Sequence, residues 1–116
     1  MSDVTIFHNP RCKKSREGLE HLQDAGVEPT IRKYLDEPLT ADELRGLLAK
    51  IGAGPRDVIR KQEKVFRELG LKDPAKTDDE LIEAMVANPK LIGRPIVVRG
   101  DKAVLALPHD KIDELL

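Results

Sequence analysis

The order of elements predicted for residues 4–34 constrains the fold more than any other part of the chain. Val4 to Phe7 is β-branched and aromatic, as strands are. From Lys13 apolar residues recur at helical spacing, and Gly26 supplies a helix end. Residues 29–34 alternate as a second strand does. Because a helix separates the two predicted strands, we expect them to pair in parallel.

The middle of the chain, about residues 40–88, predicts helices and no strand. Thr40 with Glu43, and Thr77 with Glu80, have the spacing of capping boxes at helix starts. Residues 56–69 are helical in character and are followed by Gly70.

The last part of the chain predicts a hairpin and a short helix. Residues 96–98 and 103–105 are strand-like and flank a turn at Gly100 and Asp101, and residues 109–116 indicate a final helix. The fold class is therefore predicted to be α/β, with a mixed sheet interrupted by a helical insertion. We expect one domain over residues 1–116, with the insert at about residues 40–88.

Charge and cysteine content exclude several classes of function. The 20 basic and 21 acidic residues nearly cancel, and aromatic residues make up 3%, so we expect no nucleic-acid partner. The chain contains no apolar run of about 18 residues and no signal-peptide core, so we expect no membrane association. One cysteine cannot form an internal disulfide. We therefore expect a cytoplasmic monomer with no bound metal or organic cofactor.

The single cysteine, Cys12, lies where the first predicted strand turns into the first predicted helix. Free N–H groups at a helix start favour a thiolate, and four cations surround this position in the sequence. They are Arg11, Lys13, Lys14 and Arg16. We interpret Cys12 as a reactive thiolate that meets an oxyanion; the alternative is a small buried apolar side chain.

The motifs HNPRCKKSR at residues 8–16 and RPIVV at residues 94–98, together with Arg60, resemble the glutaredoxin-linked arsenate reductase (ArsC) family. The likeness runs from Ile6 nearly to the C-terminus. It implies a thioredoxin-like fold with a helical insertion, which agrees with the predicted order of elements. It also implies arsenate, or a similar oxyanion, as substrate.

The resemblance assigns the reacting groups. Cys12 would be the nucleophile that attacks arsenate, and His8 would help to set its ionisation. Arg60 and Arg94 would bind the oxyanion. Because the chain has no second cysteine, a thiol from outside must reduce the adduct, and the family implies glutathione as co-substrate and glutaredoxin as partner.

Three further residues are predicted near the site. Ser15 replaces the second cysteine of a C-x-x-C motif, and it either donates a hydrogen bond to the thiolate or only satisfies early helix N–H groups. Pro95 resembles the cis-proline before the third strand of thioredoxin-like folds. Asn9 marks the turn before Cys12.

Leu107 stands where the family's third arginine is expected, and no arginine follows Arg99. The chain therefore resembles a short ArsC-like branch that lacks this arginine and has a shorter C-terminal segment.

Some alternatives stay open at this point. His8 could be a turn residue only, Arg60 a solvated helix charge, and Arg16 the partner of Glu20. A phosphatase-like reductase is excluded, because its C-x5-R loop needs arginine where Gly18 stands. An Spx-like regulator that binds RNA polymerase, and a glutathione-dependent thiol reductase of another substrate, remain as alternative functions.

Overall fold

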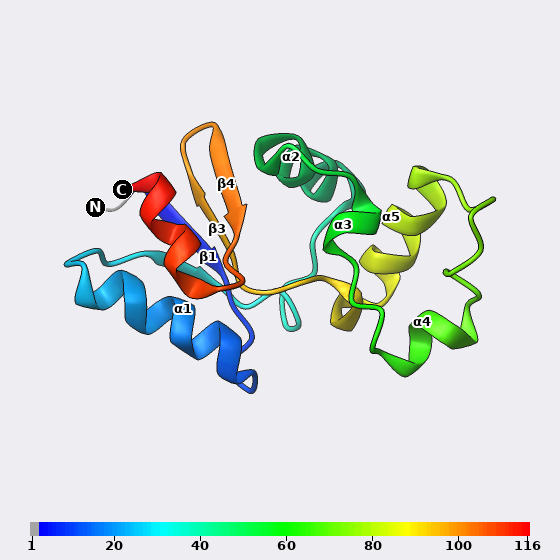
Figure 1. Cartoon of the computed structure of the whole chain (residues 1–116), viewed down its shortest axis with the longest axis horizontal. Coiled ribbons are helices and arrows are strands. Elements are labelled where there is room, and N and C mark those ends of the chain that lie inside the picture. Colours follow the sequence, from blue (N-terminus) through cyan, green and yellow to red (C-terminus); the bar gives the residue numbers. More distant parts are fainter. Residues whose placement is uncertain (1–2) are drawn as a thin grey trace. The chain divides into compact units, whose positions relative to one another are not determined.

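Four strands form one mixed sheet in the order β2-β1-β3-β4 in the computed structural model, which describes residues 3–116 (Figure 1). They are β1 (Val4–Phe7), β2 (Thr30–Arg32), β3 (Ile96–Arg99) and β4 (Lys102–Leu105). β1 and β2 pair in parallel, with Ile6 opposite Ile31, which confirms the expected strand–helix–strand unit. β3 pairs antiparallel with both β1 and β4. The α/β fold class predicted from the sequence is confirmed.

The β3–β4 connection is the hairpin that the sequence predicted. Gly100 has a φ of 63°, a conformation that residues with a Cβ rarely adopt, and it allows the tight reversal before Lys102. Val97 lies opposite Val104 across the hairpin.

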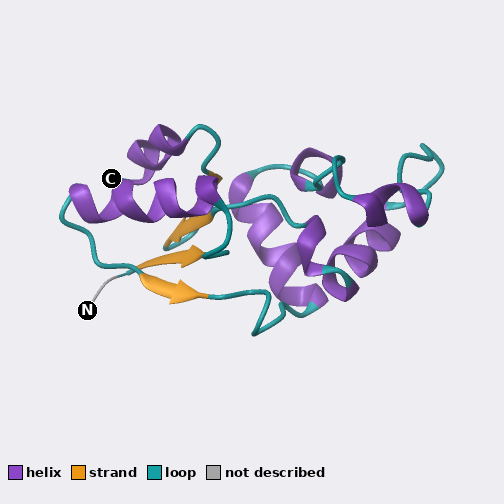
Figure 2. Ribbon diagram, turned by 90° about the horizontal axis from the view of Figure 1, so that it is seen from below, coloured by secondary structure: helices purple, strands orange, loops and turns teal. Residues whose placement is uncertain are grey.

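One face of the sheet is covered by α1 (Lys13–Asp24) and by the 3-10 helix η2 (His109–Leu115), which pack against each other (Figure 2). His21 of α1 lies 2.7 Å from Asp113 of η2. The buried side chains between sheet and helices come from β1, α1, β3 and η2 and from the loop after β4; they are Val4, Ile6, Leu22, Val97, Ala106, Ile112 and Leu115.

Residues 38–93 form a second compact unit that contains helices and no strand. Its elements are α2 (Ala41–Ile51), α3 (Pro55–Val58), α4 (Lys64–Glu68), α5 (Asp78–Ala87) and η1 (Pro89–Leu91). Both predicted capping boxes are present, at the starts of α2 and α5. The first unit combines residues 1–37 with residues 94–116. The expectation of one domain stays a prediction.

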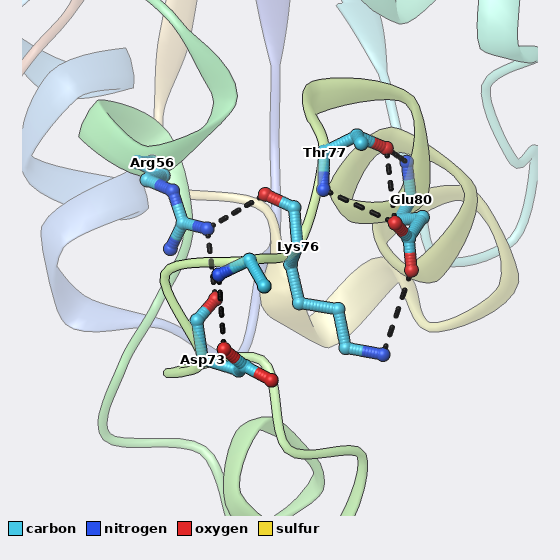
Figure 3. A network of polar contacts seen from close by, with 6 residues as sticks. Arg56, Asp73, Lys76, Thr77 and Glu80 are labelled. Carbon is cyan, nitrogen blue, oxygen red and sulfur yellow. Dashed lines mark hydrogen bonds and ion pairs between the residues drawn. The ribbon is translucent and has the colours of Figure 1, made fainter.

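A polar network fixes the loop between α4 and α5 (Figure 3). One guanidinium nitrogen of Arg56 donates to the backbone carbonyls of Asp73 and Lys76, at 3.0 and 2.8 Å. Next to it, Thr77 and Glu80 exchange the hydrogen bonds of the capping box. Two carbonyl groups of the loop, those of Asp73 and Lys76, are therefore satisfied by the Arg56 side chain.

Residues 56–69, which are helical in character in the sequence, do not form one continuous helix. α3 ends at Val58, Ile59 forms an isolated antiparallel bridge with Ile92, and α4 begins only at Lys64. The Arg60 N–H donates to the Leu91 carbonyl at 2.8 Å. Pairing with residues distant in sequence thus overrides the local helical preference.

None of the helices that residues 3–116 form is long and apolar enough to cross a membrane.

Candidate functional site

The turn between β1 and α1 is held by hydrogen bonds along its whole length. The Asn9 side-chain oxygen accepts the Arg11 N–H, and the Asn9 carbonyl accepts the Cys12 N–H, both at 3.0 Å. Arg16 donates from Nη1 to the Pro10 carbonyl at 3.0 Å instead of pairing with Glu20. The backbone that carries Cys12 is therefore fixed before any ligand arrives.

Cys12 is the N-cap residue of α1, and its half-buried thiol is free. Arg94 Nε lies 2.8 Å from Cys12 Sγ and donates to it. Burial raises the pKa of the Cys12 thiol, but hydrogen bonds from the backbone N–H groups of Ser15 and Lys14 and from Arg94 outweigh it, so the pKa lies below its ordinary value. The thiolate is thus stabilised by the first turn of α1 and by one guanidinium.

Strand pairing explains why Arg94 meets Cys12. Ile96 is paired with Phe7, so the residues before β3 run beside the turn that follows β1. The Arg94–Pro95 peptide is cis, as the resemblance implied. A Cβ built on Gly18 of α1 would lie 2.6 Å from Pro95 Cγ, so only glycine lets α1 approach Pro95 this closely. Contact between α1 and the Pro95 ring therefore supports the position of Arg94.

Behind the turn lies a buried link between His8 and Ser15. Ser15 is fully buried, and His8 is only 5% exposed. Ser15 Oγ lies 2.8 Å from His8 Nδ1 and accepts the Asn9 N–H at 2.9 Å. The Ser15 hydroxyl therefore contacts His8 and the Asn9 N–H, and it neither donates to the thiolate nor accepts from an early helix N–H. The group of Ser15 that stabilises the thiolate is its backbone N–H. Contact of Ser15 with substrate stays a prediction.

The surroundings of His8 disfavour the charged form of its imidazole. Burial, and then the positive charges of Lys33 and Arg16, hold the pKa of His8 below its ordinary value, against the opposing effect of Ser15.

A pocket of about 260 Å³ opens at the same edge of the sheet. It is lined by residues of the two loops that follow the parallel strands β1 and β2: His8, Asn9, Pro10, Arg11, Lys33, Leu35 and Asp36. Lys33 and Asp36 were not predicted as site residues. The parallel pairing of β1 and β2, which the sequence did predict, is the signal that places residues after both strands at one edge.

Arg60 lies between α3 and α4 in the helical unit, so it is not on a solvated helix face. Its guanidinium Nη1 lies 2.5 Å from Glu63 Oε1, and both side chains are about three-quarters buried. Its backbone is tied to Leu91, three residues before Arg94 in the sequence. The role of Arg60 toward an oxyanion stays a prediction. Among residues 3–116, no group of three or more His, Cys, Asp or Glu side chains is placed to hold a metal ion.

A mixed sheet, a cysteine at the N-cap of the first helix and a cis-proline before β3 define a thiol protein of the thioredoxin-like class. The ArsC family model matches residues 7–115, and the chain belongs to that family.

Relatives of known sequence and structure agree with this assignment. An arsenate reductase of Escherichia coli K12 is 45% identical over 116 residues, covering 100% of this chain and 82% of its own. The uncharacterized Escherichia coli protein YfgD is 45% identical over 97% of this chain and 96% of its own. The solved structure of an arsenate reductase from Vibrio cholerae is 40% identical, with a TM-score of 0.95 over 97% of each chain.

Proposed function

We propose that this protein is an arsenate reductase in which the Cys12 thiolate attacks arsenate. The observation that carries the proposal is the 2.8 Å contact of Arg94 Nε with Cys12 Sγ. Arg94 makes no other side-chain hydrogen bond or ion pair within residues 3–116, so its two terminal nitrogens are available to an oxyanion beside the thiolate. Arginine suits this task because its planar fork binds oxyanions in a bidentate manner.

In the first step a Cys12 S–As bond forms and one As–O bond breaks. The leaving hydroxide takes a proton and departs as water. The stabilised thiolate supplies the electron pair, and Arg94 offsets the negative charge that accumulates when two anions meet. We also propose Arg60 as a second oxyanion ligand, as the family resemblance implies.

In the second step an external thiol reduces the adduct, because the chain has one cysteine only. The incoming sulfur bonds to Cys12 Sγ, the S–As bond breaks, and its electron pair stays on arsenic. Arsenic(V) thus becomes arsenic(III), two thiols become one disulfide, and the thiol proton ends on an arsenite oxygen. We propose glutathione as this thiol and glutaredoxin as the partner that returns Cys12 to its reduced form. No resident cofactor takes part in this scheme.

The test is arsenate-dependent NADPH oxidation, coupled through glutathione reductase, glutathione and glutaredoxin. Cys12→Ser should abolish turnover. Arg94→Ala should lower kcat/KM about ten- to a hundredfold, since a hydrogen bond to a charged group contributes about 1.5–3 kcal/mol. Arg67→Ala, which removes an exposed guanidinium of α4, is the matched control and should leave the rate unchanged.

Leu107 provides a further test of the same proposal. This side chain is 38% exposed and apolar where the family's third arginine is expected. Leu107→Arg should raise the rate of arsenate reduction, because it adds a cation for the oxyanion.

The apolar Leu107 also favours a second candidate, a glutathione-dependent reductase of another oxidised substrate. Turnover of a glutathione mixed disulfide, together with no turnover of arsenate by either the wild-type chain or Leu107→Arg, would favour this second candidate.

A further inference from the structure

We propose that the pocket between the loops after β1 and β2 is the binding site of the thiol co-substrate, a small peptide thiol with two carboxylates and one ammonium group. This inference rests on the proposed function and adds the place and charge pattern of thiol recognition. Glutathione has this chemistry and is the probe used below.

Chain connectivity puts one wall of the pocket next to Cys12. Its wall includes Arg11, the residue directly before Cys12, and Cα atoms of consecutive residues are about 3.8 Å apart. A tripeptide extends over about 10–11 Å. A ligand anchored on the pocket wall can therefore present its central residue, which carries the thiol in glutathione, to Cys12 Sγ.

The charges of the pocket match such a ligand. Arg11 and Lys33 offer two cations and Asp36 offers one carboxylate, while Pro10 and Leu35 add apolar surface. Within residues 3–116, neither cation has an ion pair or a side-chain hydrogen bond. The two carboxylates and one ammonium group of such a ligand therefore match the two cations and one carboxylate of the pocket.

The pocket wall is preformed. Asn9 accepts hydrogen bonds from the N–H groups of Arg11 and Cys12, and the Arg16 guanidinium donates to the Pro10 carbonyl. On the other side, the Lys33 carbonyl accepts the N–H groups of Asp36 and Glu37, at 3.0 and 2.9 Å, in a tight turn. A preformed wall loses little conformational entropy on binding, which favours a small flexible ligand.

Binding is measured first without chemistry. S-methylglutathione, which forms no disulfide, is titrated into the full chain and followed by NMR and calorimetry. We expect shifts in the amides of His8, Asn9 and Arg11 and of residues 33–36, and binding at least about tenfold weaker for Lys33→Gln. Lys13→Gln is the matched control: this exposed cation lies beside Cys12 but not on the pocket wall, and its removal should change binding by less than about threefold.

Thiol selectivity is measured next, in the arsenate assay. Lys33→Gln should raise the KM for glutathione about tenfold and leave the KM for arsenate unchanged. Lys33→Gln should lower turnover with 2-mercaptoethanol, which carries no carboxylate, less than it lowers turnover with glutathione.

The outcomes separate the two proposals. Unchanged binding and an unchanged KM for glutathione in Lys33→Gln would overturn the pocket assignment while leaving arsenate reduction in place. Pocket binding of S-methylglutathione without arsenate turnover by any thiol would support the pocket and overturn the proposed function.

Discussion

The Cys12 thiol and the Arg94 guanidinium form one electrostatic unit. Iodoacetamide labelling against pH should give an inflection below the free-cysteine value of about 8.5. Because the thiolate is the reacting form, a lowered pKa moves the rise in labelling rate to lower pH. Arg94→Ala removes a hydrogen bond and a positive charge, so it should move the inflection upward.

Arg67→Ala is again the control and should leave the inflection unchanged. An unchanged inflection in Arg94→Ala would contradict the role assigned to Arg94.

Ser15 should contribute to stability out of proportion to its size. Its hydroxyl serves both His8 Nδ1 and the Asn9 N–H in a fully buried place. Ser15→Ala leaves both groups without their partner, and we expect a loss of about 1–3 kcal/mol in the free energy of unfolding. Urea unfolding measures this loss. A loss below about 0.5 kcal/mol would show that water or another group replaces the hydroxyl.

Sequence patterns located Cys12 well because its signals are local: a strand, a turn, a helix start and nearby cations. Arg94 was predicted only from the RPIVV motif. The pairing of Ile96 with Phe7 brings Arg94 to Cys12, and this pairing joins segments far apart in the chain. Lys33 and Asp36 were missed although the parallel pairing of β1 and β2 was predicted. Strand pairing places whole loops at one edge of the sheet, but it does not say which of their side chains line a pocket there.

At the scale of the element, the approach of α1 to Pro95 makes Gly18 a critical position. Ala is the better helix former in general, but its Cβ would meet a rigid proline ring at 2.6 Å. Gly18→Ala should therefore destabilise the chain by about 1–3 kcal/mol and weaken the contact of Arg94 with Cys12.

Gly46→Ala is the matched control, because it lies inside α2 and a Cβ there meets nothing within 4 Å. It should stabilise the chain by about 0.5–1 kcal/mol. Thermal unfolding and the pH inflection of Cys12 measure both variants. Equal effects of the two substitutions would contradict close packing at Gly18.

Helices with capping signals were predicted correctly, whereas the break between α3 and α4 was not. Thr40 and Thr77 start α2 and α5 as expected, because a capping box is encoded within four residues. Residues 56–69 carry helix-forming side chains, yet the bridge between Ile59 and Ile92 holds the backbone extended between α3 and α4.

At the scale of the whole molecule, the sheet-containing unit is assembled from both ends of the chain. Ile112 near the C-terminus is fully buried in the same core as Val4 and Ile6. Ile112→Ala should therefore cost about 2–5 kcal/mol in the free energy of unfolding. Leu116→Ala, at a side chain that is 47% exposed, should change it by no more than about 0.5 kcal/mol.

Chemical denaturation monitored by circular dichroism would compare the two variants. A cost for Ile112→Ala no larger than that for Leu116→Ala would mean that η2 is not part of the core.

The contact of α1 with Pro95 has a consequence for how this site can change by mutation. The space between positions 18 and 95 holds the proline ring of residue 95 only because residue 18 has no side chain. A larger residue at position 18 is tolerated only after position 95 has become smaller, and the order of the two changes matters. The pair therefore restricts the paths by which a chain of this fold can move Arg94 away from its thiol and acquire a different chemistry.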